Sequence, residues 1–571
     1  MYDLVIRNGQ IVDGSGQPSF MGDIAIHGDR IVKIGLVEES GNEEIDAEGN
    51  LVTPGWVDIH THYDGQVCWD EYLTPSCWHG VTTVVMGNCG VGFAPVRPGT
   101  EEFLVQLMEG VEDIPGVALN EGVSWDWESF PEYLDSIGKN NYAMDIGAMI
   151  GHGPIRSYVM GMDRCQGKEE ASDDEIAEMA QITKEAIEAG ALGFSTSRTY
   201  LHRDKFGEYV PGTEATAKEM RTIANTIADL GQGTLEIVSD WMDQDIELDW
   251  VKEFVENSDR TLTYAQTGGN PVETWRYCEE NFSKGVKIRP QFPGRPTGML
   301  FSLESTVHPF IAHPSYAEIA NKTLDEKVAA MKDESFKQRI LSEEPAVDKN
   351  HMIYTLMTAF DKQFPMDEIP DYEPSYDTSI AGIAESSNKS VMEVLYDELL
   401  KNDGKTFVWA PFSPYPDHNL DTYKMMMEFN SSVAGLSDGG AHCGLICDAS
   451  MPTWNIAHYT RDRVKGEKIP LEFLVRKQTK ETAETFGLMD RGQIKEGYMA
   501  DINIIDHENL CVYKPEMVHD LPTGSRRIIQ KAGGYIATIK SGVVTFRNDE
   551  ATGELPGTVL RGERTAEAIS A

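Results

Sequence analysis

Two histidines separated by a single residue are the side chains in this sequence best placed to do chemistry. His60 and His62 follow an apolar run at residues 54–59 that has the pattern of a buried strand. Successive side chains of a strand point to opposite faces, so both imidazoles point the same way. Two imidazoles on one face at the C-terminal end of a strand can chelate a divalent metal ion. Most isolated His-x-His pairs are ordinary core or surface residues, so the context must decide.

A carboxylate far downstream supplies part of that context. Asp438 lies in a Gly-Leu-Ser-Asp-Gly-Gly segment that follows another apolar run. At the end of a barrel strand its carboxylate can contact a metal ion and accept a proton from water, which makes Asp438 the predicted general base and acid as well as a metal ligand. An Asx-type turn is the structural alternative for this residue.

The composition restricts the partners. The chain carries 49 Lys and Arg against 93 Asp and Glu, for a formal net charge of −44, which repels nucleic acid and anionic membranes. Its eight cysteines are spread over a long chain rather than set in a small disulfide framework, so reduced thiols are expected. The N-terminus has no secretory pattern, and no run of about 20 apolar residues suggests a membrane span. We therefore expect a cytoplasmic protein with a small-molecule substrate.

The distribution of strand and helix patterns predicts the fold. Residues 1–53 contain short strand patterns separated by Asn-Gly and Asp-Gly turns, and the same texture returns from residue 497. Between them, apolar runs alternate with helical stretches, as in βα units. The candidate barrel strands end near His62, Asn88, Gly151, Ser197, Ser239, Gln266, Gln291 and Asp438.

These patterns predict an α/β protein with three parts. A TIM barrel, (β/α)8, is expected at residues 54–485, and a small β-sandwich is expected from residues 1–53 and 486–571 at the two chain ends. Residues 301–408 contain Pro-rich and acidic stretches and do not read as one βα unit, so they are predicted to be an insertion. Such an insertion would serve as a lid over the barrel mouth or as a contact in a homo-oligomer.

The combination of His60-Thr61-His62, the Gly-Asn-Cys-Gly segment around Cys89 and the segment around Asp438 resembles the amidohydrolase superfamily. Within it, the sequence is most similar to the N-acyl-D-amino-acid deacylase (D-aminoacylase) branch. The resemblance implies a barrel between N- and C-terminal β segments, and it implies that Cys89 is a metal ligand. A thiolate ligand favours Zn²⁺ over Mg²⁺ or Ca²⁺. A buried, inert cysteine is the alternative.

The sequence departs from this branch at two mid-barrel strands, where D-aminoacylases place histidines. The corresponding segments, 235–240 and 262–267, contain none. Asp240 can still offer an oxygen ligand, whereas Gln266 is a poor zinc ligand and is predicted to be a hydrogen-bonding group near the substrate. We therefore expect one zinc ion rather than two, held by His60, His62 and Asp438 with help from Cys89 or Asp240.

Five further residues are candidates for substrate contacts. His152 lies in a Gly-His-Gly-x-x-Arg stretch that resembles the D-aminoacylase branch, and it has either a structural role or a role at the site. Arg198 and Tyr200 are candidates to bind an acyl or carboxylate group. Arg289 is a candidate electrophile or anion contact, with a solvated or packing role as the alternative. His442 is expected to form a wall of the substrate site.

These observations predict a metal-dependent hydrolase that cleaves a C–N amide bond, most simply in an N-acyl (D-)amino acid. One alternative is hydrolysis of a cyclic amide, an imide or a lactone by the same machinery. A different alternative is a catalytically impaired barrel that acts as a binding protein, because two family histidines are missing. The loops and the insertion set the specificity, so the fold does not choose between substrates.

Overall fold

The computed structural model describes residues 1–571 except 168, 242–243, 267–271, 350–351 and 566–571. Its centre is an eight-stranded parallel sheet in the order β16-β12-β11-β10-β9-β8-β7-β6. The strands are β6 (Trp56–Asp58), β7 (Val81–Met86), β8 (Asp145–Gly151), β9 (Gly193–Arg198), β10 (Thr234–Ser239), β11 (Leu262–Ala265), β12 (Ile288–Phe292) and β16 (Val433–Ala434). A parallel bridge between Thr61 and Gly439 joins the chain after the first strand to the chain after the last. The predicted TIM barrel is therefore confirmed.

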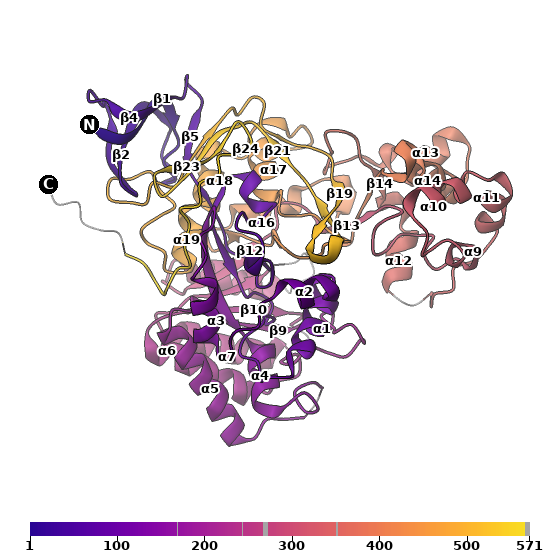
Figure 1. Ribbon diagram of the computed structural model, residues 1–571, viewed down its shortest axis with the longest axis horizontal. Helices are drawn as coiled ribbons and strands as arrows, with labels where there is room; N and C mark the ends of the chain where they lie inside the picture. The colour runs from indigo at the N-terminus through magenta and orange to yellow at the C-terminus, as the bar shows by residue number, and fades with distance from the viewer. Residues whose placement is uncertain (168, 242–243, 267–271, 350–351, 566–571) are drawn as a thin grey trace.

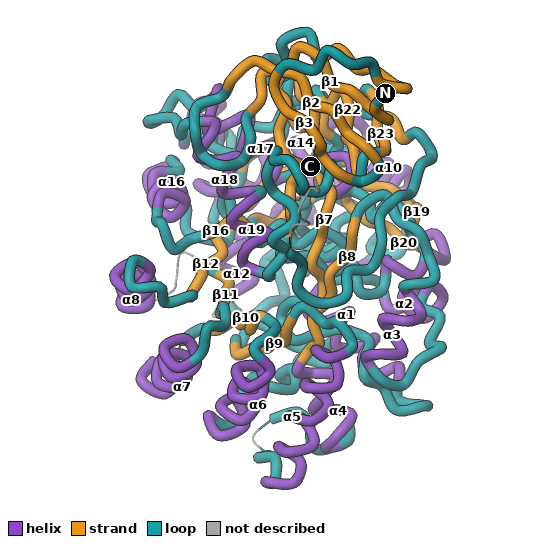
Figure 2. The backbone as a smooth tube through the Cα atoms, turned by 90° about the vertical axis from the view of Figure 1, so that its left-hand side faces the viewer, coloured by secondary structure: helices purple, strands orange, loops and turns teal. Residues whose placement is uncertain are grey.

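Helices cover the outside of the barrel (Figure 2). They are α1 (Glu101–Glu112), α2 (Gly116–Gly122), α3 (Phe130–Ile137), α4 (His152–Met160), α5 (Asp173–Glu188), α6 (Ala217–Leu230), α7 (Gln244–Asn257), α8 (Val272–Phe282), α16 (Asp421–Glu428), α17 (Met451–Ala457), α18 (Leu471–Gln478) and α19 (Lys480–Thr485). No helix among the described residues is both long and apolar enough to cross a bilayer.

Helix α5 illustrates how the sequence sets these elements. The Ser172 side chain accepts a hydrogen bond from the main-chain N–H of Glu175, and the Glu175 side chain accepts one from the main-chain N–H of Ser172. The helix therefore begins with a capping box. Its apolar residues recur at helical spacing, and Ile176, Met179 and Ile187 are buried. The strands behave differently: every residue of β7 is buried, as expected for a parallel strand covered on both faces.

Residues from both chain ends share a second, nine-stranded sheet. It contains β1 (Tyr2–Ile11), β2 (Phe20–His27), β3 (Arg30–Gly35), β4 (Gly41–Asp46), β5 (Leu51–Pro54), β17 (Ile502–Ile505), β22 (Tyr535–Lys540), β23 (Val543–Arg547) and β24 (Glu550–Ala551). The two ends meet where β5 pairs antiparallel with β17. Two small two-stranded antiparallel sheets complete the C-terminal part: β18 (Cys511–Val512) pairs with β21 (Ala532–Gly533), and β19 (Glu516–Leu521) pairs with β20 (Ser525–Ile529).

The segment predicted as an insertion forms a lobe that extends to one side of the barrel (Figure 1). Strands β13 (Gly298–Phe301), β15 (Val408–Pro411) and β14 (Phe364–Pro365) make a small sheet at its base. The helices of the lobe are α9 (Pro314–Ala317), α10 (Leu324–Met331), α11 (Glu334–Leu341), α12 (Met352–Thr358), α13 (Ile380–Ser387), α14 (Val391–Leu399) and α15 (Lys401–Gly404). The lobe has its own hydrophobic core, which includes Phe310, Ile340 and Leu395.

A buried ion network joins the barrel to the nine-stranded sheet at the N-terminal end of β8. Asp145 Oδ2 lies 2.6 Å from Arg491 Nη1 and 2.9 Å from Lys540 Nζ, and Lys540 Nζ also lies 2.9 Å from Asp501 Oδ1. Burial raises the pKa of Asp145, but the ammonium of Lys540 and the guanidinium of Arg491 outweigh it, so the pKa lies below its usual value. The network is at the opposite end of the strands from His60 and His62.

We predict that Asp145→Asn lowers the free energy of unfolding by about 3–5 kcal/mol, because it leaves two buried cations without their shared anion. The depressed pKa means that this stabilisation is complete above the unfolded-state pKa of about 4 and is lost as the pH falls through the folded-state value. The difference from the wild type should therefore shrink on acidification. Urea unfolding followed by circular dichroism measures both effects.

The matched control is Asp135→Asn, which breaks an exposed ion pair with Arg561 of 2.9 Å. Because exposed pairs contribute little, this variant should unfold close to the wild-type midpoint. Equal midpoints for Asp145→Asn and Asp135→Asn would contradict the assigned role of the buried network.

Candidate metal centre

The closure of the barrel brings His60, His62 and Asp438 together. The main-chain N–H of Asp438 donates to the carbonyl of His60 at 3.1 Å, and that of His62 donates to the carbonyl of Gly439 at 2.7 Å. These two bonds fix the register between the segments after β6 and β16. Asp438, which is far from His60 and His62 in the sequence, is therefore held beside them by main-chain hydrogen bonds.

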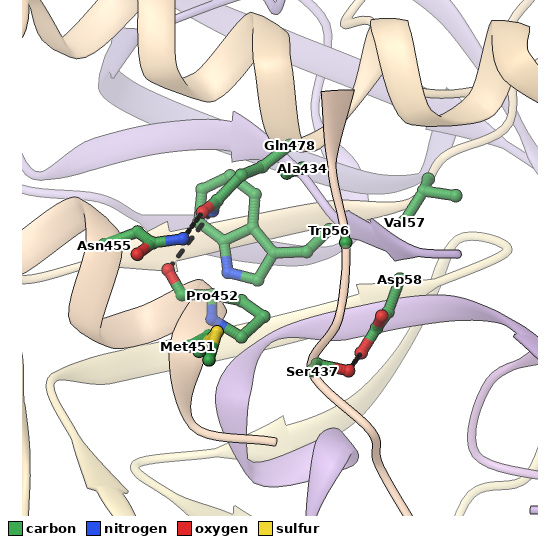
Figure 3. A pocket seen from close by; sticks show the side chains of 10 residues that line it. Trp56, Val57, Asp58, Ala434, Ser437, Met451, Pro452, Asn455 and Gln478 are labelled. Atoms are coloured by element: carbon green, nitrogen blue, oxygen red, sulfur yellow. Dashed lines mark hydrogen bonds between the residues drawn. The ribbon is translucent and has the colours of Figure 1, made fainter. Parts of the chain in front are cut away.

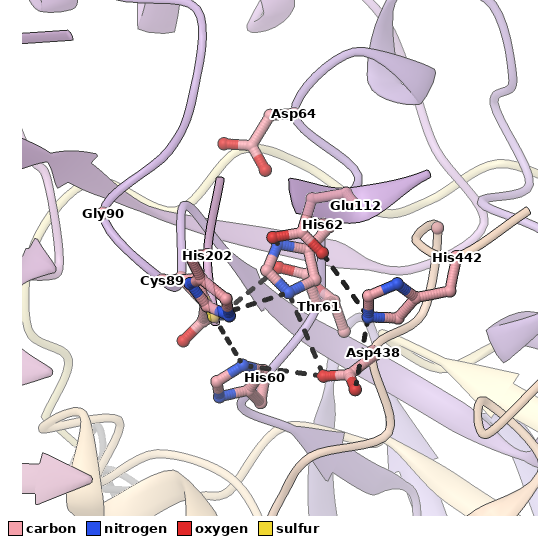
Figure 4. A network of polar contacts seen from close by, with 12 residues as sticks. His60, Thr61, His62, Asp64, Cys89, Gly90, Glu112, His202, Asp438 and His442 are labelled. Carbon is pink, nitrogen blue, oxygen red and sulfur yellow. Dashed lines mark hydrogen bonds and ion pairs between the residues drawn. The ribbon is translucent and has the colours of Figure 1, made fainter. Parts of the chain in front are cut away.

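Cys89 approaches the same point from the loop after β7. Its Sγ lies 3.4 Å from His60 Nε2 and 4.0 Å from His62 Nε2 (Figure 4). Asp438 Oδ1 lies 3.5 Å from His60 Nε2 and 3.9 Å from His62 Nε2. One donor atom from each of His60, His62 and Cys89 lies within 4.8 Å of the others, and all three residues are buried.

This donor set fits a zinc ion. Zinc binds nitrogen at about 2.0 Å and sulfur at about 2.3 Å in a tetrahedron, which places neighbouring donor atoms roughly 3.5 Å apart. The separations of the His60, His62, Cys89 and Asp438 donor atoms are close to that value. The mixed nitrogen, sulfur and oxygen donors differ from the all-oxygen ligand sets that Mg²⁺ and Ca²⁺ prefer.

The backbone is strained at the residues that form the centre. Cys89, Asp438 and His442 have φ values of 57°, 50° and 53°, in the left-handed region that non-glycine residues seldom adopt. Such conformations cost free energy and tend to gather where a side chain must be aimed at a functional point. Here three of them surround the same donor cluster.

Burial sets the electrostatics of the centre. It lowers the pKa of His60 to about 3 and raises the pKa of the Cys89 thiol. Burial, together with smaller contributions from the carboxyl groups of Asp448 and Asp58, raises the pKa of Asp438 to about 8. A bound cation favours a neutral imidazole, a thiolate and a carboxylate, so it would offset the cost of burying these groups.

Four residues that the sequence analysis did not identify also contribute to the centre. Glu236, on β10, accepts a hydrogen bond from the Cys89 N–H at 3.2 Å, and burial raises its pKa to about 8. Gln291 Oε1 lies 2.8 Å from His60 Nδ1. Glu112 Oε1 lies 3.4 Å from His62 Nδ1.

The fourth of these residues is His202, in the loop after β9. Its Nδ1 lies 2.9 Å from the Ser197 hydroxyl, and its charged form would depress the pKa of His60 and His62. Only Glu236 had a usable sequence signal, an acid within an otherwise apolar strand. Glu112 and His202 lie in segments whose spacing gives no sign that they face the barrel.

The structure corrects the role predicted for Asp240. Its Oδ1 accepts a hydrogen bond from the Thr199 hydroxyl at 2.7 Å, and its Oδ2 accepts one from the Tyr200 N–H at 2.7 Å. Both carboxylate oxygens therefore hold the loop after β9 and are not directed to the metal centre. The buried acid that β10 directs to the centre is Glu236 instead.

Two predicted substrate contacts are also engaged elsewhere. Arg198 pairs with Glu247, with Nη2 and Oε1 2.5 Å apart, and donates to main-chain carbonyls of the following loop. Arg289 is the second residue of β12, at the end of the barrel away from the centre, and its Nη2 lies 2.6 Å from Glu481 Oε2. Both arginines stabilise the barrel wall.

Of the remaining predicted substrate contacts, some bond elsewhere in the protein and one lies at the centre. His152 takes its structural alternative, because its Nε2 lies 2.7 Å from Glu219 and its Nδ1 lies 2.8 Å from Thr196. Tyr200 lies on an exposed loop against the ring of Tyr209.

Gln266 is buried and bonds within the barrel, since its Oε1 accepts from the Tyr264 hydroxyl at 3.0 Å. His442 does belong to the centre, because its Nε2 lies 3.7 Å from Glu112 Oε2 and 4.0 Å from Asp438 Oδ2.

A small cavity lies beside Asp58 and Ser437, close to the centre in the sequence (Figure 3). The Ser437 hydroxyl donates to Asp58 Oδ2 at 2.5 Å, which ties the first and last strands together. Burial raises the pKa of Asp58 to about 6. The cavity volume of about 20 Å³ is enough for a water molecule but not for a substrate.

The fold and the metal-binding donors define a class of protein. The model of the amidohydrolase family matches residues 43–546, so the chain belongs to the amidohydrolase family. The chain is therefore a hydrolase that acts on carbon–nitrogen bonds other than peptide bonds. The matched region contains the whole barrel and the predicted insertion.

Individual relatives narrow this class. The chain is 26% identical over 571 residues to a D-aminoacylase of Alcaligenes xylosoxydans xylosoxydans, covering 98% of this chain and 97% of that protein. A solved D-aminoacylase structure matches with a TM-score of 0.64 at 22% identity, covering 98% of this chain and 100% of the other. An N-acyl-D-glutamate deacylase from Bordetella bronchiseptica, solved with zinc and a phosphonate inhibitor, matches with a TM-score of 0.63 at 20% identity, covering 98% and 99%. The two structural likenesses establish the fold.

We predict that the double variant His60→Ala/His62→Ala loses its bound transition metal, because it removes two of the three clustered donors. The wild type should retain about one metal ion per chain after dialysis against a weak chelator. Asp240→Asn is the matched control and should retain the metal, since that carboxylate holds Thr199 and Tyr200. Inductively coupled plasma mass spectrometry measures all three proteins. Metal loss in Asp240→Asn would reinstate Asp240 as a ligand.

Proposed function

We propose that this protein removes the acyl group from an N-acyl-D-amino acid, with one zinc ion held by His60, His62 and Cys89. The observation that carries the proposal is the convergence of these donors with Asp438 at the barrel mouth. Similarity to a D-aminoacylase over nearly the whole chain supports the substrate class. The thiol of Cys89 supports zinc over other divalent ions.

Asp438 is the residue placed to handle protons. Its Oδ1 faces the two imidazoles, and its Oδ2 faces His442 Nε2. When bound, zinc would lower the pKa of an attacking water and polarise the substrate carbonyl. The carboxylate of Asp438 accepts the proton of that water and later passes it to the leaving nitrogen, which breaks the amide into an acid and an amine.

His442 is the residue placed to contact the substrate. It is the more exposed imidazole of the centre, with a side-chain exposure of 20% against 1% for His60 and His62. Burial lowers the pKa of His442 to about 4, so its ring is neutral near pH 7 and retains one N–H to donate. A neutral imidazole at the mouth can hydrogen-bond a substrate oxygen without repelling the metal.

A second candidate is the hydrolysis of a cyclic amide, an imide or a lactone. The charged groups that shift the pKa of Asp438 are the carboxyl groups of Asp448 and Asp58. Arg198, a candidate acyl or carboxylate contact, and Arg289, a candidate electrophile or anion contact, are engaged with Glu247 and Glu481. This arrangement favours a substrate without a carboxylate beside its reacting carbonyl.

The binding-protein alternative has less support, because a non-catalytic barrel has no need for a strained backbone at Cys89, Asp438 and His442. We further propose a cytoplasmic location and a homo-oligomeric state. All eight cysteines are free, which supports a reducing compartment.

We predict that Asp438→Asn lowers kcat at least about 100-fold, because it removes the proton acceptor while preserving the shape of the side chain. The test compares zinc-loaded wild type and variant on N-acyl-D-amino acids, their L-enantiomers, cyclic amides and lactones. Asp438 Oδ1 is also one of the four clustered donor atoms, so both proteins are compared at equal zinc occupancy, and their circular dichroism spectra should match. Near-normal turnover in Asp438→Asn would remove Asp438 from the mechanism. Turnover confined to cyclic substrates would replace the proposed substrate class with the second candidate.

A further inference from the structure

Glu112 is a buried carboxylate at the end of α1 that lies between two imidazoles of the centre. Its side chain is 2% exposed. Its Oε1 lies 3.4 Å from His62 Nδ1, and its Oε2 lies 3.7 Å from His442 Nε2. Its main-chain carbonyl also accepts a hydrogen bond from the His442 N–H. Figure 4 shows Glu112 next to His62, with a dashed line that joins Glu112 to His442.

The surroundings of Glu112 leave the two imidazoles as its partners. Its other charged neighbours are the carboxyl groups of Asp438, Asp64 and Glu236, which offer no N–H to Glu112. Glu112 Oε1 and His62 Nδ1 are both buried, and neither makes a hydrogen bond to any described atom. Each is therefore the partner available to the other, at a separation slightly longer than a hydrogen bond.

We propose that Glu112 is a positioning residue that fixes the ring of His62 for metal binding. With Nδ1 protonated and donating to Glu112 Oε1, the lone pair of His62 is confined to Nε2, the atom that faces Cys89 and Asp438. The main-chain carbonyl of Glu112 holds His442 at the mouth by accepting a hydrogen bond from the His442 main-chain N–H. This inference rests on the proposed function, because it places zinc at His62 Nε2.

The other metal-binding histidine provides an internal comparison. His60 Nδ1 lies 2.8 Å from the side-chain oxygen of Gln291, a neutral amide. Both rings therefore have an acceptor behind them, but that of His62 is a carboxylate. An anionic acceptor increases the basicity of the imidazole more than an amide does, so His62 is the stronger donor to the metal. Glu112 supplies this difference from a helix outside the strands that carry the ligands.

The test measures zinc affinity by competition with a chelator in Glu112→Gln and Glu112→Ala. We expect an affinity loss of about 10-fold for the glutamine variant, which keeps an acceptor but loses the charge, and about 100-fold for the alanine variant. If the loss of zinc affinity in the alanine variant came only from lost packing, glutamine would restore the affinity fully. A remaining loss in the glutamine variant therefore reports the contribution of the carboxylate charge. The visible spectrum of the cobalt-substituted protein should change in both variants, because the spectrum reports the ligand field at the metal.

Two further variants serve as controls. Glu109→Gln changes an acid on the same helix that is partly exposed and lies 3.3 Å from Lys205 Nζ, and it should leave both readouts unchanged. His442→Ala removes the second contact of Glu112 and should raise KM without changing zinc affinity. Wild-type zinc affinity and an unchanged cobalt spectrum in Glu112→Gln and Glu112→Ala would overturn the inference.

The two proposals fail separately. If zinc affinity depends on Glu112 but no N-acyl amino acid is hydrolysed, the positioning role stands and the proposed function fails. If N-acyl-D-amino acids are hydrolysed and zinc affinity is independent of Glu112, the proposed function stands and this inference alone fails. The glutamine variant preserves side-chain volume, so the test does not depend on whether the alanine variant folds.

Discussion

The centre depends on the backbone pairing that closes the barrel. The bonds from Asp438 N to His60 O and from His62 N to Gly439 O join the first and last strands where their carboxyl ends meet. Parallel strands in a closed barrel deliver all their carboxyl ends to one face, so no loop has to reach across the molecule. The Ser437–Asp58 hydrogen bond repeats the connection one layer deeper. A change in this register would separate Asp438 from both histidines at once.

That geometry explains why the centre concentrates acidic groups. Glu112 and Glu236 are buried beside Cys89 and Asp438 is half-buried there, and each of the three carboxyl groups raises the pKa of the thiol. Burying several acids together is unfavourable unless a cation compensates, and the basic residues in the barrel wall are already paired with other acids. The arrangement is therefore that of a cation site. The net charge of −44 provides solubility but no attraction for an anionic substrate, so local groups must supply it.

The sequence predicted the strands well and the side-chain directions less well. Strands such as β7 and β8 were recognisable because buried parallel strands are largely apolar runs, and the motifs around His60, Cys89 and Asp438 mark the ends of three strands. Asp240 was misassigned because it lies just beyond the end of β10, whereas the inward-facing acid is Glu236, four residues earlier. In a strand, such a choice depends on register, which local sequence does not determine.

Arg289 and Glu112 are two more residues whose positions the local sequence does not determine. Arg289 was a candidate substrate contact with a packing role as the alternative, and it lies near the start of β12, at the end of the strand that does not carry the site. Glu112 ends a helix whose outer face carries similar acids, and only the tertiary packing of α1 turns it inward.

The mid-barrel strands show where the centre departs from the family pattern. Where the resemblance implies histidines, β10 and β11 are followed by Asp240 and Gln266, which bond within the protein. The nearby Gln291 supports His60 through its amide oxygen. The three clustered donors come from the segments after β6 and β7, and Asp438 follows β16, which the bridge between Thr61 and Gly439 makes their neighbour. All four donors therefore lie on one side of the barrel mouth, while the opposite side supplies hydrogen-bonding groups.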